Sequence, residues 1–274
     1  MSTQKTEKEL AFLYDLYVAT DWGLRFAELI DEHVKVPARG RALYVASGTG
    51  GHALALRERG GPELTLVGVD ESEERVELAR AKAVAVKDDN TEFGHALLEA
   101  LSFEDEQFDL VVGDASLVGA ERLPEMLAEM VRVAAPGARV ALVVATAASF
   151  GEFFSVYWEA LVNAGFLEDA GAVESFIKDL PTISDAEALA AREALEAVAS
   201  WTRAEEFDYA SGGEFVNAPL FRNFLGDRWL DALPDEAARA AVLAEVERII
   251  DEERNEAEFS LSVKASIVVG RKGK

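Results

Sequence analysis

The stretch Arg41–Ala53, with the sequence RALYVASGTGGHA, decides the fold of this chain. Its segment Leu43–Ala46 is a short apolar run typical of a buried strand, and Ser47–Gly51 is a glycine-rich turn. Ala53 then restarts an apolar pattern at helical spacing. A strand that enters a helix through such a turn directs backbone N–H groups and the positive end of the helix dipole at one point. We therefore expect an anionic group to bind there; the alternative is an ordinary tight connection without a ligand.

A second apolar strand, Leu64–Val69, ends in Asp70, twenty positions after Gly50. An acidic residue at the tip of the second strand is where the hydroxyl pair of a ribose is held. Gly48 and Gly50 allow positive φ angles and a close approach of a ligand to the backbone. The spacing Gly48-x-Gly50-x-x-Ala53 also satisfies the dinucleotide fingerprint, with alanine in last place. The residues alone therefore leave two cofactor classes open, NAD and S-adenosylmethionine (SAM).

The charge and the absence of cysteine exclude several classes of site. The net charge is −24, from 27 basic and 51 acidic residues, and Lys and Arg cluster only at the C-terminal tail, residues 271–274. Nucleic acid and anionic membranes are therefore poor partners. Without cysteine, disulfides and thiolate metal sites are excluded. The three histidines are scattered, so we expect no histidine-rich metal site: His33, His52 and His95. The many carboxylates leave an oxygen-ligand site open, but we assign no metal.

The apolar residues are distributed as in a globular protein. No run of 18 apolar residues occurs, and residues 1–10 are polar and charged, so we expect neither a transmembrane span nor a signal peptide. The sequence predicts an acidic cytoplasmic protein with one large α/β domain or one domain with an insertion.

Strand-type and helix-type segments alternate between residues 41 and 144. This alternation predicts an α/β, Rossmann-like, doubly wound and mostly parallel sheet. Ligands on such sheets bind at the carboxyl ends of the strands, where Ser47–Gly50, Asp70, His95 and Asp114 all fall. The long apolar segment 259–269 fits a terminal antiparallel strand added to this sheet.

The segments outside this alternation predict two further parts. Residues 1–40 are expected to form helices that cover the site, with Tyr14, Tyr17 and Trp22 facing the core or helping to cover the ligand. Residues 171–254 are assigned to an inserted helical cap, with a strand at 172–178 and helices at 184–199 and 234–254. The aromatic residues of 151–230 either wall an apolar substrate pocket or form a small core of their own. The SAM-binding core is assigned to 41–170 and 255–274.

From Arg41 to about Phe166, five motifs in order resemble class I SAM-dependent methyltransferases, most like the bacterial small-molecule branch. These are Val45–Gly50, Gly68–Ser72, Leu101–Val111, Met130–Arg139 and Asn163–Phe166. The resemblance implies that the glycine loop holds the methionine part of SAM, that Asp70 accepts the ribose hydroxyls, and that residues near 95 and 114 border the adenine and the reaction side. The cofactor-binding residues it implies are Tyr44, Ala46, Ser47, Gly48, Thr49, Gly50, Asp70, Glu71, His95, Ala96, Asp114 and Ala115.

Three of these positions depart from the family pattern. Tyr44 stands where the family usually has an acidic residue near the cofactor's ammonium group. His95 replaces a common aspartate that contacts the adenine amino group, and Glu71 stands where an apolar residue often packs on adenine.

The function that the resemblance implies is a SAM-dependent methyltransferase (EC 2.1.1 class) that transfers a methyl group to a small, largely apolar acceptor. Because the cofactor is already activated, alignment is the main work of the protein. Asp114 and His52 are the candidates for a general base, and no catalytic residue is assigned. The rival functions are a catalytically degenerate binding protein, suggested by the three departures, and an NAD(P)-dependent oxidoreductase, which the lack of a Tyr-x-x-x-Lys pair disfavours.

Overall fold

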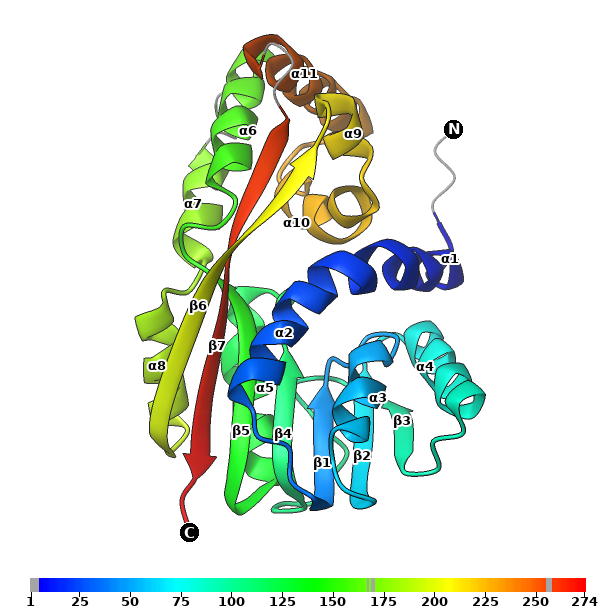
Figure 1. Cartoon of the computed structure of the whole chain (residues 1–274). Coiled ribbons are helices and arrows are strands. Elements are labelled where there is room, and N and C mark those ends of the chain that lie inside the picture. The colour runs from blue at the N-terminus through cyan, green and yellow to red at the C-terminus, as the bar shows by residue number, and fades with distance from the viewer. Residues whose placement is uncertain (1–4, 167, 169–170, 255–257) are drawn as a thin grey trace. The chain divides into compact units, whose positions relative to one another are not determined.

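The computed structural model describes residues 5–166, 168, 171–254 and 258–274 (Figure 1). The chain forms two compact units. The first comprises Met1–Val144, Ile183–Thr202 and Ala265–Lys274, and the second comprises Ala145–Thr182 and Arg203–Lys264. The expected domain boundaries at residues 170 and 255 lie outside the described residues. Residues 145–166, which the sequence assigned to the SAM-binding core, belong to the second unit.

The first unit is built on a seven-stranded sheet with the order β3-β2-β1-β4-β5-β7-β6. Its strands are β1 (Arg39–Val45), β2 (Glu63–Asp70), β3 (Thr91–His95), β4 (Phe108–Asp114), β5 (Ala134–Thr146), β6 (Leu195–Tyr209) and β7 (Phe259–Lys272). β1 pairs in parallel with β2 and β4, β2 with β3, and β4 with β5. β7 runs antiparallel beside β5. This is the Rossmann-like sheet with a terminal antiparallel strand that the alternating pattern predicted, and the prediction is confirmed.

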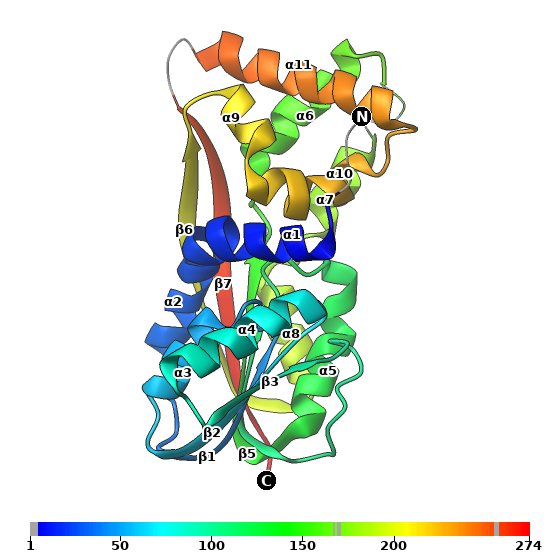
Figure 2. The ribbon, with the colours of Figure 1, turned by 90° about the vertical axis from the view of Figure 1, so that its right-hand side faces the viewer.

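Helices cover both faces of this sheet (Figure 2). The helices α2 (Gly23–His33), α3 (Gly51–Glu58) and α4 (Glu73–Val86) lie on one face, and α5 (Leu123–Val133) and α8 (Ile183–Arg192) lie on the other. α5 turns a stripe of apolar residues toward the strands, and its Met126 and Met130 are fully buried. A Cβ at Gly113 of β4 would lie 2.8 Å from the Met130 side chain, so the absence of one lets α5 pack close to the sheet.

The N-terminal helices that the sequence predicted form one continuous run, Glu7–His33. α1 (Glu7–Leu13) begins with a capping box in which Thr6 and Glu9 bond reciprocally. A π-helical segment, η1 (Tyr14–Trp22), then leads into α2 without a break. The wider π turn changes which side chains share a face. Trp22 is 1% exposed, whereas Tyr17, expected to face the core or to help cover the ligand, is 54% exposed.

Two expectations for the later segments are wrong. The strand expected at 172–178 is the helix α7 (Gly171–Asp179), in which Val173 is buried and Ile177, four positions later, is exposed. The helix expected to reach residue 199 ends at Arg192, and the strand β6 follows from Leu195. Ala and Glu in this segment favour a helix, but pairing with β7 at the sheet edge overrides that preference.

The second unit has an aromatic core of its own. Its helices are α6 (Gly151–Asn163), α7, α9 (Gly212–Asn217), η4 (Phe221–Leu225), α10 (Gly226–Leu230) and α11 (Glu236–Arg254). The Phe153 ring lies 5.3 Å from Tyr157 and 4.8 Å from Trp229, and both contacts are stacked. The buried Tyr157 hydroxyl donates to the Trp229 carbonyl at 2.8 Å. Of the two alternatives for these aromatic residues, the ring contacts favour a separate core.

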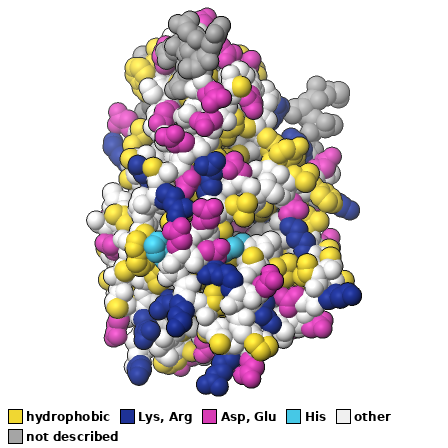
Figure 3. Space-filling view, viewed as in Figure 1, with side chains coloured by type: hydrophobic (Ala, Val, Ile, Leu, Met, Phe, Trp, Pro, Cys, Tyr) yellow, Lys and Arg dark blue, Asp and Glu magenta, His cyan; other side chains and the backbone are white. Residues whose placement is uncertain are grey.

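No helix in the described ranges has the length and apolar character needed to cross a membrane. On the face shown in Figure 3, Lys and Arg side chains are scattered among Asp and Glu side chains and do not gather in one patch.

Candidate active site

The glycine loop between β1 and α3 has left-handed backbone at three positions. Gly48 and Gly50 have φ angles of 56° and 76°, and Ala46 has a φ of 56°. This region suits glycine and strains alanine. At Gly50 a Cβ would lie 2.7 Å from the side chains of Ala79 and Phe93, so the loop packs directly against α4 and β3. The loop therefore needs glycine at position 50 for both its conformation and its close packing.

Asp70 lies at the carboxyl end of β2, beside this loop, as the sequence predicted. Its side chain is buried and accepts hydrogen bonds from the backbone N–H groups of Gly48 (2.9 Å) and Ser72 (3.0 Å). The guanidinium of Arg75 lies 3.7 Å from the same carboxylate. The Gly48 contact ties the ends of β1 and β2 together.

Charged residues form a cluster beside the carboxyl end of β3. The His95 ring Nε2 lies 3.0 Å from the Glu71 carbonyl oxygen. The Glu71 carboxylate pairs with Arg122 at 2.5 Å, and Arg122 also donates to Glu99 at 2.9 Å. Hydrogen bonds from Arg122 lower the pKa of Glu99 below its usual value. Glu71 and His95 thus belong to a polar, hydrogen-bonded cluster and do not form an apolar surface for an adenine ring.

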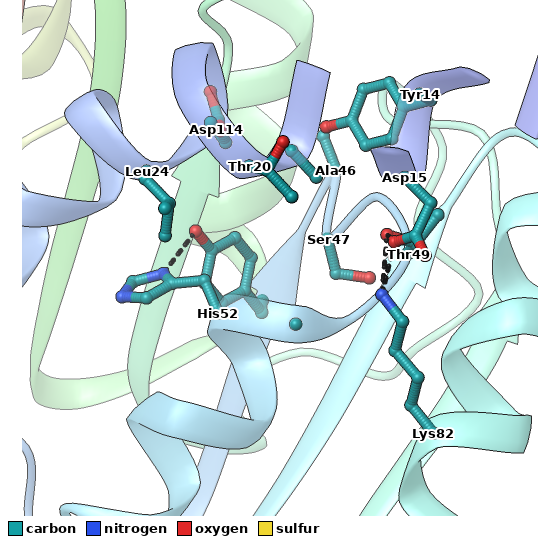
Figure 4. Close-up of a pocket in the computed structure, with 14 residues that line it drawn as sticks. Tyr14, Asp15, Thr20, Leu24, Ala46, Ser47, Thr49, His52, Lys82 and Asp114 are labelled. Atoms are coloured by element: carbon teal, nitrogen blue, oxygen red, sulfur yellow. Dashed lines mark hydrogen bonds and ion pairs between the residues drawn. The ribbon is translucent and has the colours of Figure 1, made fainter. Parts of the chain in front are cut away.

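A pocket opens at the carboxyl ends of β1 and β4, with an empty volume of about 680 Å³ that includes open solvent (Figure 4). It is lined by Tyr14, Asp15, Ala19, Thr20, Gly23, Leu24, Tyr44, Ala46, Ser47, Thr49, Gly51, His52, Lys82 and Asp114. The structure thus brings together the predicted residues Tyr44, Ala46, Ser47, Thr49, His52 and Asp114. The lining does not include Gly48, Gly50, Asp70, Glu71, His95, Ala96 or Ala115.

Tyr14 of η1 lines this pocket and packs on the glycine loop. Its ring lies on Gly48, where an added Cβ would come within 2.7 Å of the ring Cε1 and the hydroxyl oxygen. The Arg75 guanidinium lies 4.1 Å from the centre of the same ring, within the range of a cation–π contact. Burial raises the pKa of Tyr14 above its ordinary value. Tyr14 therefore covers the glycine loop at Gly48.

One wall of the pocket contains a chain of three hydrogen-bonded side chains. The Tyr44 hydroxyl lies 2.9 Å from Nδ1 of His52, and Nε2 of His52 lies 3.0 Å from Oδ1 of Asp31 in α2. Burial lowers the pKa of His52 to about 4, so the ring is neutral at pH 7. Burial is the main cause that raises the pKa of Tyr44 well above 10, and the nearby Asp114 carboxylate raises it further.

Asp114 lies at the end of β4 and completes this wall. Its Oδ1 accepts from the backbone N–H of Ser116 at 3.0 Å. Burial raises the pKa of Asp114, and its hydrogen bonds from Ser116 oppose the shift.

The opposite end of the pocket is formed by Asp15 of η1, Thr49 of the loop and Lys82 of α4 (Figure 4). Thr49 donates to Asp15 at 2.5 Å, and the Lys82 ammonium pairs with Asp15 and donates to Thr49 at 3.1 Å. These contacts attach the N-terminal helices to the glycine loop. Within the part of the chain that the structure describes, no group of three or more His, Asp or Glu side chains is arranged to hold a metal ion.

Sequence reasoning missed the residues that come to the site from helices. These are Asp15, Asp31, Lys82 and Arg122. Each looks like an ordinary charged residue of a solvated helix face, and only the packing of α2, η1 and α4 around the loop brings the first three to it.

Comparison with known proteins decides the family. A family model described as a methyltransferase domain matches residues 42–137. The demethylmenaquinone methyltransferase of Deinococcus radiodurans is 31% identical over 166 residues, which are 58% of this chain and 67% of that protein. The chain belongs to the class I SAM-dependent methyltransferase family. The enzyme of the same name from Shouchella clausii is 35% identical over 109 residues, 40% of this chain and 46% of that protein, so the chain spans about half of that relative's length.

Solved structures agree on the fold of this family member. The YcgJ protein of Bacillus subtilis superimposes with a TM-score of 0.60 at 19% identity, covering 92% of this chain and 99% of that one. The structure of a putative sarcosine dimethylglycine methyltransferase from Galdieria sulphuraria gives a TM-score of 0.53 at 13% identity, covering 93% of this chain and 85% of that one.

The residues present fit the cofactor of the family. Gly48 and Gly50 give the loop its left-handed backbone, and Asp70 lies beside it at the end of β2. The Ser47 hydroxyl is buried and has no hydrogen-bond partner, so the loop offers a polar group that a ligand can satisfy. The Tyr14 ring covers Gly48, so a ligand that binds the backbone at this position has to displace it.

Proposed function

We propose that this chain is a SAM-dependent methyltransferase of the EC 2.1.1 class that acts on a small, largely apolar acceptor. The observation that carries the proposal is the hydrogen bond from the Gly48 N–H to the Asp70 carboxylate, because it joins the glycine loop of β1 to the acidic end of β2. Family membership supports the same chemistry. SAM, when bound, supplies a methyl group on a sulfonium centre, ready for direct transfer.

The chain's own residues bind the cofactor, orient it toward the acceptor and exclude water. The loop Ala46–Gly50 is suited to hold the methionine part of the cofactor through backbone N–H groups, and Asp70 to accept from its ribose hydroxyls. Glu71, His95 and Ala96 are assigned to the adenine side, and Ala115 to the reaction side with Asp114. Alignment of two reactants in a closed pocket is the main source of acceleration that such a site can supply.

The acceptor is assigned to the pocket beside Tyr44. Apolar surface there comes from Ala19, Leu24 and Ala46, and hydrogen-bonding groups come from Thr20 and Asp114. A mostly apolar lining with a few polar groups is typical of small-molecule sites. The curated relatives named above are called demethylmenaquinone methyltransferases. We infer an acceptor of the same general kind, small and largely apolar, and a cytoplasmic location stays a prediction of the sequence.

A catalytically degenerate binding protein is the second candidate. Tyr14 on Gly48 favours it, because a side chain that covers the loop can replace the cofactor permanently. The family assignment removes the support for the dinucleotide-dependent alternative.

Calorimetric titration with S-adenosylhomocysteine (SAH) separates the two candidates. We expect the wild-type chain to bind SAH and Asp70→Asn to bind about tenfold or more weakly, since a hydrogen bond to a charged group contributes about 1.5–3 kcal/mol. Asp89→Asn, at an exposed turn, is the matched control and leaves the affinity unchanged.

Because Asp70 also holds the Gly48 N–H, the unfolding temperature of Asp70→Asn is measured in parallel, so that a folding defect is recognised. Absence of binding at millimolar SAH, in both the wild type and Tyr14→Ala, would support the degenerate protein. If SAH binds, the mass gain of one methyl group in a panel of small phenols, quinols and amines tests catalysis.

A further inference from the structure

The helix α4 carries apolar side chains on two opposite sides. Val76, Ala79 and Ala83 are buried against the first unit. A second stripe, at the spacing i, i+3, i+6 and i+7, lies on the opposite side of the helix and is formed by Leu78, Ala81, Val84 and Ala85. Val84 is 77% exposed. A helix that covers a sheet needs one apolar side only, and a contiguous exposed stripe of this kind is typical of a protein–protein contact.

A hollow lies beside the N-terminal half of this stripe, where α1 packs on α4 (Figure 2). It has an empty volume of about 470 Å³ that includes open solvent. Phe12 of α1 contributes to the hollow and is 45% exposed. The remaining lining residues are Lys8, Ala11, Glu74, Glu77 and Leu78. The hollow therefore combines an apolar lining, with room for an aliphatic side chain, and carboxylates from α4.

One rotation relates the two ends of the stripe. Leu78 lies three positions before Ala81, and Val84 lies three positions after it. If a second copy is turned by half a rotation about an axis at Ala81, the two α4 helices run antiparallel, and each Val84 meets Leu78 and the hollow of the other copy. The small side chain of Ala81 lets the helix axes approach to about 8 Å. The stripe is thus complementary in shape to itself.

The charges near the two ends of α4 fit the same antiparallel arrangement. Glu77 lines the hollow and Lys87 caps the end of the helix, and both residues are exposed. The rotation brings Lys87 of each copy close to Glu77 of the other, and it also sets the two helix dipoles antiparallel. A parallel pairing would instead put like charges side by side. At an ionic strength of about 0.15 M the Debye length is about 8 Å, so the net charge of −24 on each copy is largely screened beyond direct contacts.

We propose that the outward stripe of α4, together with Phe12, is the surface by which two copies of this chain form a symmetric dimer. The proposal does not depend on the proposed function. A second copy is favoured over another partner because the same surface carries the exposed valine and the hollow that receives it, and also both members of the charge pair. Such self-complementarity is what an isologous contact requires.

Sedimentation velocity of the full chain tests the stripe over a concentration series of about 1–100 µM. We expect the wild type to pass from monomer to dimer within this series. Val84→Asp should remain monomeric, because two carboxylates would enter the apolar hollows, and its unfolding temperature should stay unchanged because the side chain is exposed. Val86→Asp is the matched control: this valine is 63% exposed on the same helix, outside the stripe, and its replacement should leave the dimer unchanged.

A charge exchange tests the pairing of Lys87 with Glu77. Lys87→Glu and Glu77→Lys should each raise the dissociation constant of the dimer about tenfold or more, because each puts like charges together twice in a symmetric contact. Mixed in equal amounts, the two variants should recover the association of the wild type, since both contacts of the mixed dimer then pair opposite charges. Another arrangement of the two copies does not predict this recovery.

A cross-link tests the position of the axis. The chain contains no cysteine, so Ala81→Cys introduces a single thiol. The two thiols of a dimer meet at the axis, so mild oxidation should give a disulfide-linked dimer, whereas Val86→Cys should stay unlinked.

Four results would overturn the inference: a wild type that stays monomeric throughout the series, Val84→Asp dimers as tight as those of the wild type, mixed charge variants that do not recover association, or equal cross-linking of the two cysteine variants. A monomeric wild type would assign the stripe to a partner other than a second copy.

Discussion

Gly48→Ala is the sharpest structural test of the site, because it probes the contact between the glycine loop and Tyr14. Two effects add at this position. Alanine in the left-handed region costs about 1–2 kcal/mol. The new Cβ would also lie 2.7 Å from the Tyr14 ring, and forcing such a contact in a packed region costs about 1–3 kcal/mol more. We therefore expect Gly48→Ala to destabilise the chain by roughly 2–5 kcal/mol.

Gly137→Ala supplies the matched control, since its φ angle is also positive, at 81°, and no atom lies within 4 Å of the added Cβ. Gly137→Ala should lower the free energy of unfolding by about 1–2 kcal/mol only, the cost of a left-handed backbone for alanine. In a Tyr14→Ala background, the loss of unfolding free energy caused by Gly48→Ala should fall to the loss that Gly137→Ala causes. Equilibrium unfolding in urea measures all four variants. Equal losses for Gly48→Ala and Gly137→Ala in the wild-type background would refute the placement of Tyr14 on the loop.

Three further predictions concern the same loop and its neighbours. Tyr14→Ala should raise the association rate of SAH severalfold in stopped-flow fluorescence, because the ring no longer has to leave Gly48 and the Arg75 contact no longer opposes opening; an unchanged rate would argue against a covering role. Ala46→Gly should stabilise the chain by about 0.5–1 kcal/mol in urea, since it relieves a φ of 56° on a residue with a side chain, and a loss of stability would contradict this. His52 has a pKa lowered from 6.5 to about 4 in the folded state, so its contribution is present above pH 6.5 and is lost as the pH falls toward 4. His52→Gln should therefore flatten the decline of the free energy of unfolding between pH 6.5 and 4, which His52 makes about 3 kcal/mol in the wild type. The raised pKa of Asp114 acts in the opposite direction, equally in both proteins. Equal slopes of unfolding free energy against pH in the two proteins would exclude the lowered pKa of His52.

The sequence by itself determined the sheet, because its signals are local. A strand, a turn with two glycines at positive φ and a helix follow one another within residues 41–58, and the apolar runs of β2, β4 and β5 each end where the next element must begin. Parallel strands linked by helices have their carboxyl ends at one edge, so Asp70 and Asp114 were placed from their position in the chain alone. β6 was missed because its Ala- and Glu-rich sequence favours a helix, and the strand exists only through pairing with β7.

Only the tertiary structure decided which side chains meet over the loop. Tyr14 on Gly48, Asp31 behind His52, and Lys82 against Asp15 each join residues 21 or more positions apart, and they depend on the angle at which α2, η1 and α4 pack on the sheet. A sequence pattern records the face of a helix but not the partner that the face meets. The physical reason is that hydrophobic burial fixes the elements locally, whereas the direction of a polar side chain at a site is set by packing between elements that are distant in the chain.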